Sequence, residues 1–459
     1  MTDARSVNTH GRIIGALWPV VLIAVSGWLA AAGAAAQPGV SVGAAFARFW
    51  NAKSPREAQN ASADVIASGV SFADAFDRLR RGRPYSANVE RGIVHLSRRS
   101  GRDIFYYDLD VPKTYNPART YQVRIQLHGG VNGRDTSAPR GDGSIGALAG
   151  DVEQIYVIPY AWTGAPWWTT AQLLNLRAIL DSVKRTYNVD ENRVALAGVS
   201  DGATATYYFA MRDTTPFASF LSLNGFIMVL GNPSVRAEGD LFPNNLLNKP
   251  YFMINGGLDP LYPVRFVEPY IEQFKQGGLE LEYWPQPTTA HNTSWWPEMK
   301  DKFEAFVHAH PRSPLPDKLT WESTGQALTS RAHWLVIDQL AMQRDVAPLP
   351  DLTDQIQTVG GEDQPSSPKL LIHDVSFGRV DLKRTGNTVE ATTYGVWEFT
   401  LLISPDVFDL SKPIKVVANR RVVFDGRVEP SLATLMKWAA RDNDRTMLFA
   451  AELHIKPLE

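Results

Sequence analysis

The chain has 459 residues, more than one ordinary hydrophobic core holds, so two or more domains are expected. The formal charge is −2 with acidic and basic residues mixed, and no basic stripe interleaved with aromatics points to a nucleic-acid partner. The chain has no cysteine, which excludes disulfides, thiolate chemistry and cysteine-ligated zinc.

The first 36 residues have the pattern of a secretory signal peptide. Arg5 and Arg12 precede an apolar stretch that starts at Ile13, and three alanines end the segment at residue 36. The stretch is long enough to span a bilayer, so an uncleaved membrane anchor is the alternative. The alanine-rich end favours cleavage. We therefore expect a periplasmic or secreted protein that meets a membrane only through this segment, if it is uncleaved.

Residues 37–85 predict a helical lead-in. Apolar residues recur at helical spacing from about Val40 to Leu79. Strand-forming residues then dominate in "GIVHLS", "DIFYYDLDV" and "YQVRIQL", with turn residues between these segments. Because short turns join them, these strands are expected to form an antiparallel edge of a sheet.

From residue 154 to about residue 310, strands and helices alternate. The predicted strands are "QIYVIPY", "RVALAG", "SFLSLNG", "YFMING" and "LELEYWP". Helical patterns cover Thr170–Tyr187, Ala203–Arg212, Arg265–Gln276 and Trp295–His310. This alternation predicts an α/β fold whose mostly parallel sheet carries helices on both faces. We place this domain at residues 86–312.

The proline-rich segment "HPRSPLPDKL" marks a boundary, and residues 313–459 predict a second, mostly β domain. Strand-like segments follow one another there, interrupted by one helix at about Leu432–Ala440, as in a β-sandwich. The polar segment "APLPDLTDQIQTVGGEDQPSSPK" within this region is expected to be a long loop.

The pentapeptide G-V-S-D-G, with Ser200 at its centre, has the spacing of a nucleophile elbow. It follows a predicted strand and precedes a predicted helix, which is the context that an elbow requires. Such a turn needs small residues two positions before and after the serine, and glycines occupy both. A Ser/Asp helix cap at an ordinary turn is the alternative, and the pentapeptide alone does not decide between them.

A serine nucleophile also needs donors for an oxyanion, and "IQLHGGVNG" lies upstream of the elbow where such enzymes place one. Gly130 is the preferred donor, with Gly129 as the near alternative, and the N–H of Asp201 is the second donor. His128 is expected to brace this loop rather than act as a base. A simple glycine turn after a strand is the alternative.

A triad acid and base are found downstream of Ser200. Asp259 follows a predicted strand in "INGGLDPLYP", although Asp-Pro turns are common. His291 lies in the loop of "PTTAHNTSWWPE", after the last predicted strand of the domain. Ser200, Asp259 and His291 follow one another in the chain order of the α/β-hydrolase triad, which differs from other serine hydrolase orders.

The segments "LHGGVNG", "YNVDENRVALAGVSDGAT", "NGGLDPLYP" and "AHNTSWWPE" resemble secreted bacterial α/β-hydrolases of the esterase or predicted-peptidase type. That group is similar to polyhydroxybutyrate depolymerases and feruloyl esterases. The resemblance covers roughly residues 90–310. It implies Ser200 as nucleophile, His291 as base, Asp259 as orienting acid, and oxyanion donors at Gly130 and Asp201. Members of that group often have Gly-His at the histidine that acts as the base, where this chain has Ala290-His291.

Aromatic residues cluster near the predicted site and suggest a wall for a flat or polymeric ester: Trp162, Trp167, Trp168 and Trp295. Packing of helix starts explains them equally well. The favoured function is hydrolysis of small or polymeric carboxylic esters, without a cofactor. A serine peptidase with the same triad and a binding protein on an inactive hydrolase scaffold are the alternatives. No H-E-x-x-H motif or Asp-rich calcium loop predicts a metal.

Overall fold

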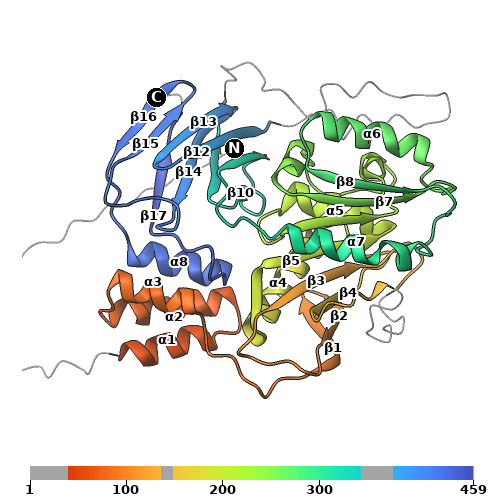
Figure 1. The fold of residues 1–459 in the computed structure, drawn as a ribbon. Helices are drawn as coiled ribbons and strands as arrows, with labels where there is room; N and C mark the ends of the chain where they lie inside the picture. The colour runs from red at the N-terminus through yellow and green to blue at the C-terminus, as the bar shows by residue number, and fades with distance from the viewer. Residues whose placement is uncertain (1–39, 136–147, 343–375, 458–459) are drawn as a thin grey trace, which may run out of the picture. The chain divides into compact units, whose positions relative to one another are not determined.

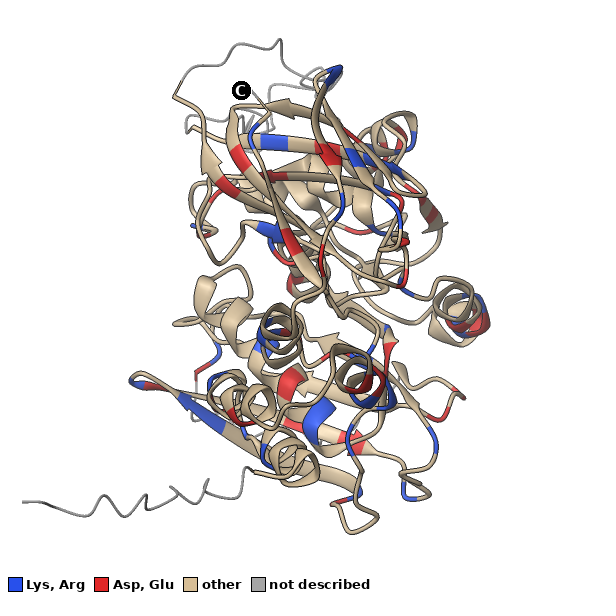
Figure 2. Cartoon of the chain, turned by 90° about the vertical axis from the view of Figure 1, so that its left-hand side faces the viewer, with Lys and Arg blue, Asp and Glu red and all other residues tan. Residues whose placement is uncertain are grey.

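The computed structural model describes residues 40–135, 148–342 and 376–457 (Figure 1). The predicted signal segment at residues 1–36 and the predicted loop at residues 347–369 lie outside these ranges. Among the described helices, none has the length and apolar character needed to cross a membrane. Acidic and basic residues are interspersed on the strands and helices that face the viewer in Figure 2.

The helical lead-in consists of three helices, each capped by a serine whose hydroxyl accepts a backbone N–H three residues on. They are α1 (Val42–Asn51), α2 (Pro55–Ala67) and α3 (Phe72–Arg81). Their apolar faces form one hydrophobic cluster with α8 (Leu432–Asp442) from the other end of the chain. The lead-in therefore completes its core with a helix of the C-terminal region, a pairing that the local pattern of either segment does not reveal.

A single eight-stranded sheet forms the central domain, in the order β1-β2-β4-β3-β5-β6-β7-β8. The strands are β1 (Gly92–Ser100), β2 (Asp103–Val111), β3 (Tyr121–Leu127), β4 (Ile155–Pro159), β5 (Val189–Val199), β6 (Ser219–Leu223), β7 (Tyr251–Gly256) and β8 (Leu281–Gln286). β2 pairs antiparallel with both β1 and β4, and every other neighbouring pair is parallel. The predicted antiparallel edge is therefore confirmed for β1 and β2, but it is wrong for β3, which lies inside the sheet and runs parallel to both of its neighbours, β4 and β5.

Helices cover both faces of this sheet: α4 (Thr170–Thr186), α5 (Asp201–Arg212), α6 (Val264–Gln276) and α7 (Trp296–Ala309), with 3₁₀ helices η2 (Ile227–Gly231) and η3 (Pro243–Asn248). Successive side chains of a strand point to opposite faces. On β5, Val194 and Leu196 join the cluster of α4, α5 and α6, whereas Ala195 and Ala197 join that of α7. This arrangement is the α/β-hydrolase fold that the sequence predicted.

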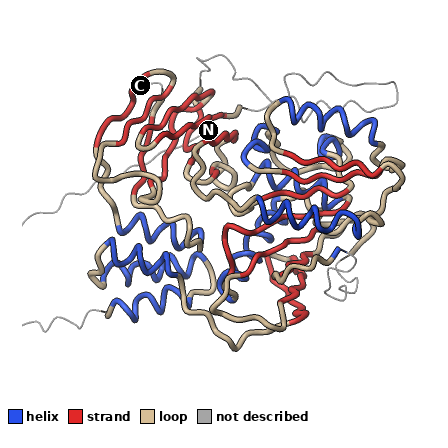
Figure 3. The backbone as a smooth tube through the Cα atoms, in the orientation of Figure 1, coloured by secondary structure: helices blue, strands red, loops and turns tan. Residues whose placement is uncertain are grey.

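The C-terminal region is β-rich, as expected, and contains two sheets (Figure 3). Their strand orders are β10-β11-β14-β17 and β16-β15-β13-β12-β9. The strands are β9 (Lys318–Ser323), β10 (Arg331–Ala332), β11 (Leu335–Leu340), β12 (Gly378–Thr385), β13 (Thr388–Tyr394), β14 (Val396–Ile403), β15 (Ile414–Ala418), β16 (Arg421–Gly426) and β17 (Ala451–Ile455). Buried side chains from both sheets form one hydrophobic core.

Candidate active site

Ser200 lies in the sharp turn between β5 and α5, with φ 56° and ψ −116°. A positive φ is uncommon for a residue with a side chain and stores strain that the surroundings must hold. The Ser200 N–H donates to the carbonyl of Leu223 on β6 at 3.0 Å, and its carbonyl accepts from the Thr204 N–H at 2.9 Å. These two bonds fix the strained residue between the sheet and the first turn of the helix.

Gly198 and Gly202 permit this turn because there is no room for a side chain at either position. A Cβ on Gly198 would lie 2.1 Å from the carbonyl oxygen of Gly202. A Cβ on Gly202 would lie 2.3 Å from the carbonyl oxygen of Leu127, at the end of β3. The helix therefore packs backbone to backbone against the strand ends, and the serine side chain is left at their carboxyl edge.

The structure brings together the three residues that the sequence predicts as a triad. His291 Nε2 lies 2.8 Å from Ser200 Oγ, and His291 Nδ1 lies 2.6 Å from Asp259 Oδ2. A carboxylate only accepts, so Nδ1 carries the proton and Nε2 is free to accept the proton of the serine hydroxyl. The Asp259 side chain is fully buried, whereas that of His291 is 18% exposed.

The Asp259 carboxylate is held by its own loop. Its Oδ1 accepts the N–H groups of Leu261 at 2.8 Å and Tyr262 at 3.0 Å, which leaves Oδ2 for His291. Bonds from the backbone orient a carboxylate rigidly, because the N–H groups cannot rotate away. The loop also carries exposed apolar side chains, since Leu258 is 65% exposed and Leu261 is 63% exposed.

Asn224, at the end of β6, fixes the loop that carries the histidine. Its Nδ2 donates to the Asn292 carbonyl at 2.9 Å, and its Oδ1 accepts the Gly256 N–H at 3.2 Å. Gly256 lies so close to this loop that a Cβ would meet the Ala290 carbonyl oxygen at 2.4 Å. Sequence reasoning missed Asn224, whose only signal was an Asn-Gly pair at the end of the predicted strand "SFLSLNG".

The glycine loop after β3 lies against Ser200, since a Cβ on Gly129 would be 2.8 Å from Ser200 Cβ. His128 Nε2 accepts the Ala161 N–H at 3.1 Å, so its Nδ1 carries the proton and donates to the Gly129 carbonyl at 2.9 Å. In a trans peptide, the N–H of Gly130 then points away from that carbonyl. Gly130 has a φ of +61°, which glycine adopts readily.

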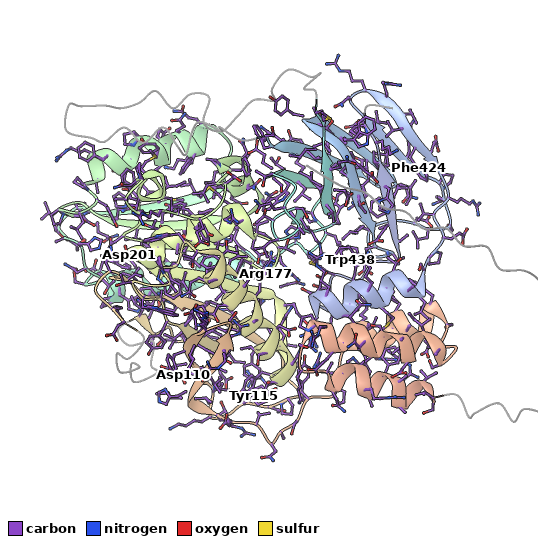
Figure 4. All side chains as sticks on the ribbon, turned by 180° about the vertical axis from the view of Figure 1, so that it is seen from behind. Asp110, Tyr115, Arg177, Asp201, Phe424 and Trp438 are labelled. Carbon is purple, nitrogen blue, oxygen red and sulfur yellow. The ribbon has the colours of Figure 1, made fainter. Side chains whose placement is uncertain are left out.

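The next peptide in this loop is also anchored on both sides. Arg134 Nε donates to the Gly130 carbonyl at 2.9 Å, and the Val131 N–H donates to Asp201 Oδ2 at 2.7 Å. Asp201, labelled in Figure 4, begins α5, where the backbone N–H groups lack partners within the helix. Its carboxylate therefore ties the elbow to the glycine loop, a role that sequence reasoning did not foresee because the two residues are far apart in the chain.

Burial keeps His128 neutral. Its pKa is lowered from 6.5 to about 4, chiefly by desolvation and further by the charge of Arg134. The Gly129 carbonyl and the Asp201 carboxylate act in the opposite direction. A neutral imidazole with its proton on Nδ1 can donate to Gly129 and accept from Ala161 at the same time, so the loop keeps its shape at neutral pH.

The four tryptophans expected to face the substrate lie in the core, with exposed fractions between 1% and 9%: Trp162, Trp167, Trp168 and Trp295. Trp167 Nε1 donates to the His128 carbonyl at 2.9 Å, and the ring of Trp162 packs against Phe105 with centroids 5.2 Å apart. Rings this deeply buried present almost no surface to a substrate. These tryptophans pack inside the protein, as the alternative interpretation has it. The expectation that they line the site and face a substrate is therefore corrected.

Two further features lie apart from the triad. Asp338, Glu398 and His454 place one potential ligand atom each within 4.8 Å of one another, and they are the one such metal-compatible group among the described residues. A cavity of about 530 Å³ is lined in part by Arg80 and Arg445. These two cations are paired with acidic side chains, and no triad residue lines the cavity.

Comparisons with known proteins give structural likenesses only. No protein-family model matches the chain, and no curated protein sequence matches it. Similar solved structures include a thermostable esterase (19% identity, 48% of this chain, TM-score 0.38), of whose length this chain spans 63%. A second is Est1E from Butyrivibrio proteoclasticus, with 16% identity over 47% of this chain and 99% of that chain and a TM-score of 0.37. A third is S-formylglutathione hydrolase from Staphylococcus aureus, with 17% identity over 48% of this chain and 98% of that chain and a TM-score of 0.37. The function is therefore argued from the site itself.

Proposed function

We propose that this chain is a serine hydrolase that cleaves carboxylic esters through an acyl-enzyme. One observation carries the proposal: a serine with positive φ lies 2.8 Å from an imidazole nitrogen whose other nitrogen lies 2.6 Å from a buried carboxylate. A nucleophile, a base and a group that orients the base are the parts that such chemistry needs.

In the proposed reaction, Ser200 Oγ attacks the ester carbonyl while His291 Nε2 takes its proton. Asp259 holds the imidazole and stabilises the imidazolium that forms. The N–H groups of Gly130 and Asp201 would stabilise the oxyanion of the tetrahedral intermediate. His291 then gives its proton to the departing alcohol, and water repeats the sequence on the acyl-enzyme.

Assays with chromogenic substrates test this proposal. Purified protein is offered short p-nitrophenyl esters, feruloyl esters, polyhydroxybutyrate and peptide p-nitroanilides, with Ser200→Ala as the matched control. We expect ester turnover that Ser200→Ala abolishes. Ester turnover that survives the substitution would contradict the triad. Peptide cleavage without ester cleavage would favour a peptidase, and failure to turn over any substrate or to react with a covalent serine probe would favour a binding protein.

A further inference from the structure

Three neighbouring strands of the C-terminal region bring an imidazole and two carboxylates together. β11, β14 and β17 are adjacent in the four-stranded sheet, and they carry Asp338, Glu398 and His454 respectively. One potential ligand atom from each of these side chains lies within 4.8 Å of the other two. Because each residue comes from a different strand, no spacing in the sequence indicates that they meet.

A bulge in β11 places Asp338 in this group. Ile337 on β11 pairs with Phe399 on β14. The next pair is Gln339 with Glu398, so Asp338 is an extra residue without a partner of its own on β14. A bulge of this kind bends the strand and re-aims a side chain, and it is frequent beside functional sites. Here it brings the Asp338 carboxylate close to the Glu398 carboxylate, where regular pairing would separate acid from acid.

The two carboxylates lack a basic partner. Among the residues that the structure describes, neither Asp338 nor Glu398 is ion-paired with a lysine or an arginine. The charged group nearest to Glu398 is His454, whose Nδ1 lies 3.5 Å from Oε1. Even a protonated imidazole would offset only one of the two negative charges. Like charges side by side on neighbouring strands destabilise a sheet, so a bound cation would relieve a repulsion that the side chains leave in place.

Thr400 holds the acid and the imidazole in position. It pairs with His454 across β14 and β17, and its Oγ1 lies 2.8 Å from His454 Nδ1. The same hydroxyl donates to Asp338 Oδ2 at 2.7 Å, which leaves Oδ1 available for another bond. Outer groups that orient the ligands are a regular part of metal sites, and they contribute to the affinity for the ion.

We propose that Asp338, Glu398 and His454 bind a divalent transition-metal ion such as Zn²⁺. Zn²⁺ accepts both imidazole nitrogen and carboxylate oxygen, whereas Ca²⁺ and Mg²⁺ prefer oxygen ligands alone. With bonds of about 2.1 Å, ligand atoms on opposite sides of the ion are about 4 Å apart, so the observed spread closes with small side-chain rotations. The ion would neutralise the carboxylates and link three strands, and binding would therefore stabilise the sheet.

Isothermal titration calorimetry of untagged, EDTA-treated and dialysed protein with Zn²⁺ tests this site. We expect one Zn²⁺ per chain, and we expect Asp338→Asn and His454→Gln each to weaken binding at least about 10-fold. Excess Zn²⁺ should raise the Tm of the wild type and change that of the two variants much less. The His454 side chain is 60% exposed, so His454→Gln should leave the Tm of the metal-free protein unchanged.

His95→Gln is the matched control. His95 Nδ1 also lies beside a carboxylate, 2.7 Å from Asp108, but the described residues provide no third ligand there. Its substitution should leave the Zn²⁺ affinity within about twofold of wild type, because two ligands alone do not complete such a site.

Four results would overturn the metal site. They are a wild-type chain that binds no Zn²⁺, an affinity that neither Asp338→Asn nor His454→Gln changes, an equal loss in His95→Gln, and tighter binding of Ca²⁺ than of Zn²⁺. The third would place the ion elsewhere, and the fourth would remove the imidazole from the ligand set. The proposed hydrolase function does not depend on this outcome, because no triad residue belongs to the group.

Discussion

The central domain contains two histidine–aspartate pairs with nearly the same geometry. His291 Nδ1 lies 2.6 Å from Asp259 on the β7 side, and His95 Nδ1 lies 2.7 Å from Asp108 across the β1–β2 pair. Both carboxylates are fully buried. The distance between imidazole and carboxylate therefore does not distinguish a candidate catalytic pair from a structural one.

The two histidine–aspartate pairs differ in which of their members is bound by a hydroxyl group. Ser200 Oγ bonds to His291 Nε2, the nitrogen that does not face the carboxylate, so a proton can pass from the serine hydroxyl to the imidazole. In the other pair, the hydroxyl of Tyr160 donates to Asp108 Oδ2 at 3.0 Å and is thus bound to the acid. His95 is also 45% exposed at the edge of the sheet. Position within a chain of hydrogen bonds, together with the strained elbow, sets the two regions apart.

Matched substitutions of the two aspartates give the largest expected difference. Asp259→Asn should lower kcat for an ester by about 10³- to 10⁴-fold, because an amide in place of the carboxylate favours the wrong imidazole tautomer. Asp108→Asn should change kcat by less than about threefold, since an amide oxygen can still accept from Tyr160. Steady-state kinetics of both variants measure the contrast. Similar losses in the two variants would show that the pairs are not functionally different.

Glycine-to-alanine substitutions, one in the elbow and one in the β1–β2 turn, test whether the elbow has room for a side chain. Gly198→Ala should destabilise the fold by about 3 kcal/mol and abolish activity, because its Cβ would overlap the Gly202 carbonyl. Gly101, in the β1–β2 turn, has a φ of +62° and open space around it. Gly101→Ala should cost about 1 kcal/mol through its φ alone and leave activity intact. Urea unfolding and ester turnover are measured together, and a fully active Gly198→Ala would contradict the tight elbow.

The pH dependence of stability tests the packing of His128 in the glycine loop after β3. The pKa of His128 falls from 6.5 in the unfolded chain to about 4 in the fold, so the unfolded state binds the proton first as the pH drops. The stability due to neutral His128 is present above pH 6.5 and is lost towards pH 4, a change of about 2–3 kcal/mol. His128→Asn retains a donor for Gly129 and lacks this titration.

We therefore expect the stability difference between wild type and His128→Asn to be largest near pH 7.5 and smaller by that amount near pH 4. Burial also lowers the pKa of His333, but that residue is present in both chains and its contribution cancels. Urea unfolding at several pH values measures the difference. A difference that stays constant across this range would show that His128 does not titrate as the burial implies.

Most of the fold could be predicted from the sequence because its signals are local. Alternation of strand and helix patterns predicts a parallel sheet covered on both faces, and the glycines around Ser200 predict a turn that has no space for a Cβ. The order of Ser200, Asp259 and His291 relative to strand ends was enough to suggest that they meet, because parallel strands bring their carboxyl ends to one edge.

Features that depend on contacts between distant segments could not be predicted. The Asp201 carboxylate accepts the Val131 N–H, and no spacing or periodicity in the sequence encodes that contact. The tryptophans show the converse problem. The sequence of an aromatic cluster near a site is the same whether its rings face a substrate or pack behind the loops. Only the burial of the rings in the structure distinguishes these two arrangements.

Covalent labelling with a fluorophosphonate probe tests the central claim most directly. The probe reacts with a serine only when a base activates it, so it reports the triad without assuming a substrate. Intact-mass and peptide mass spectrometry should show one adduct per chain, located on Ser200 and absent from Ser200→Ala and from His291→Ala. An unlabelled wild-type chain, or an adduct on another residue, would contradict the assignment of Ser200 as an activated nucleophile.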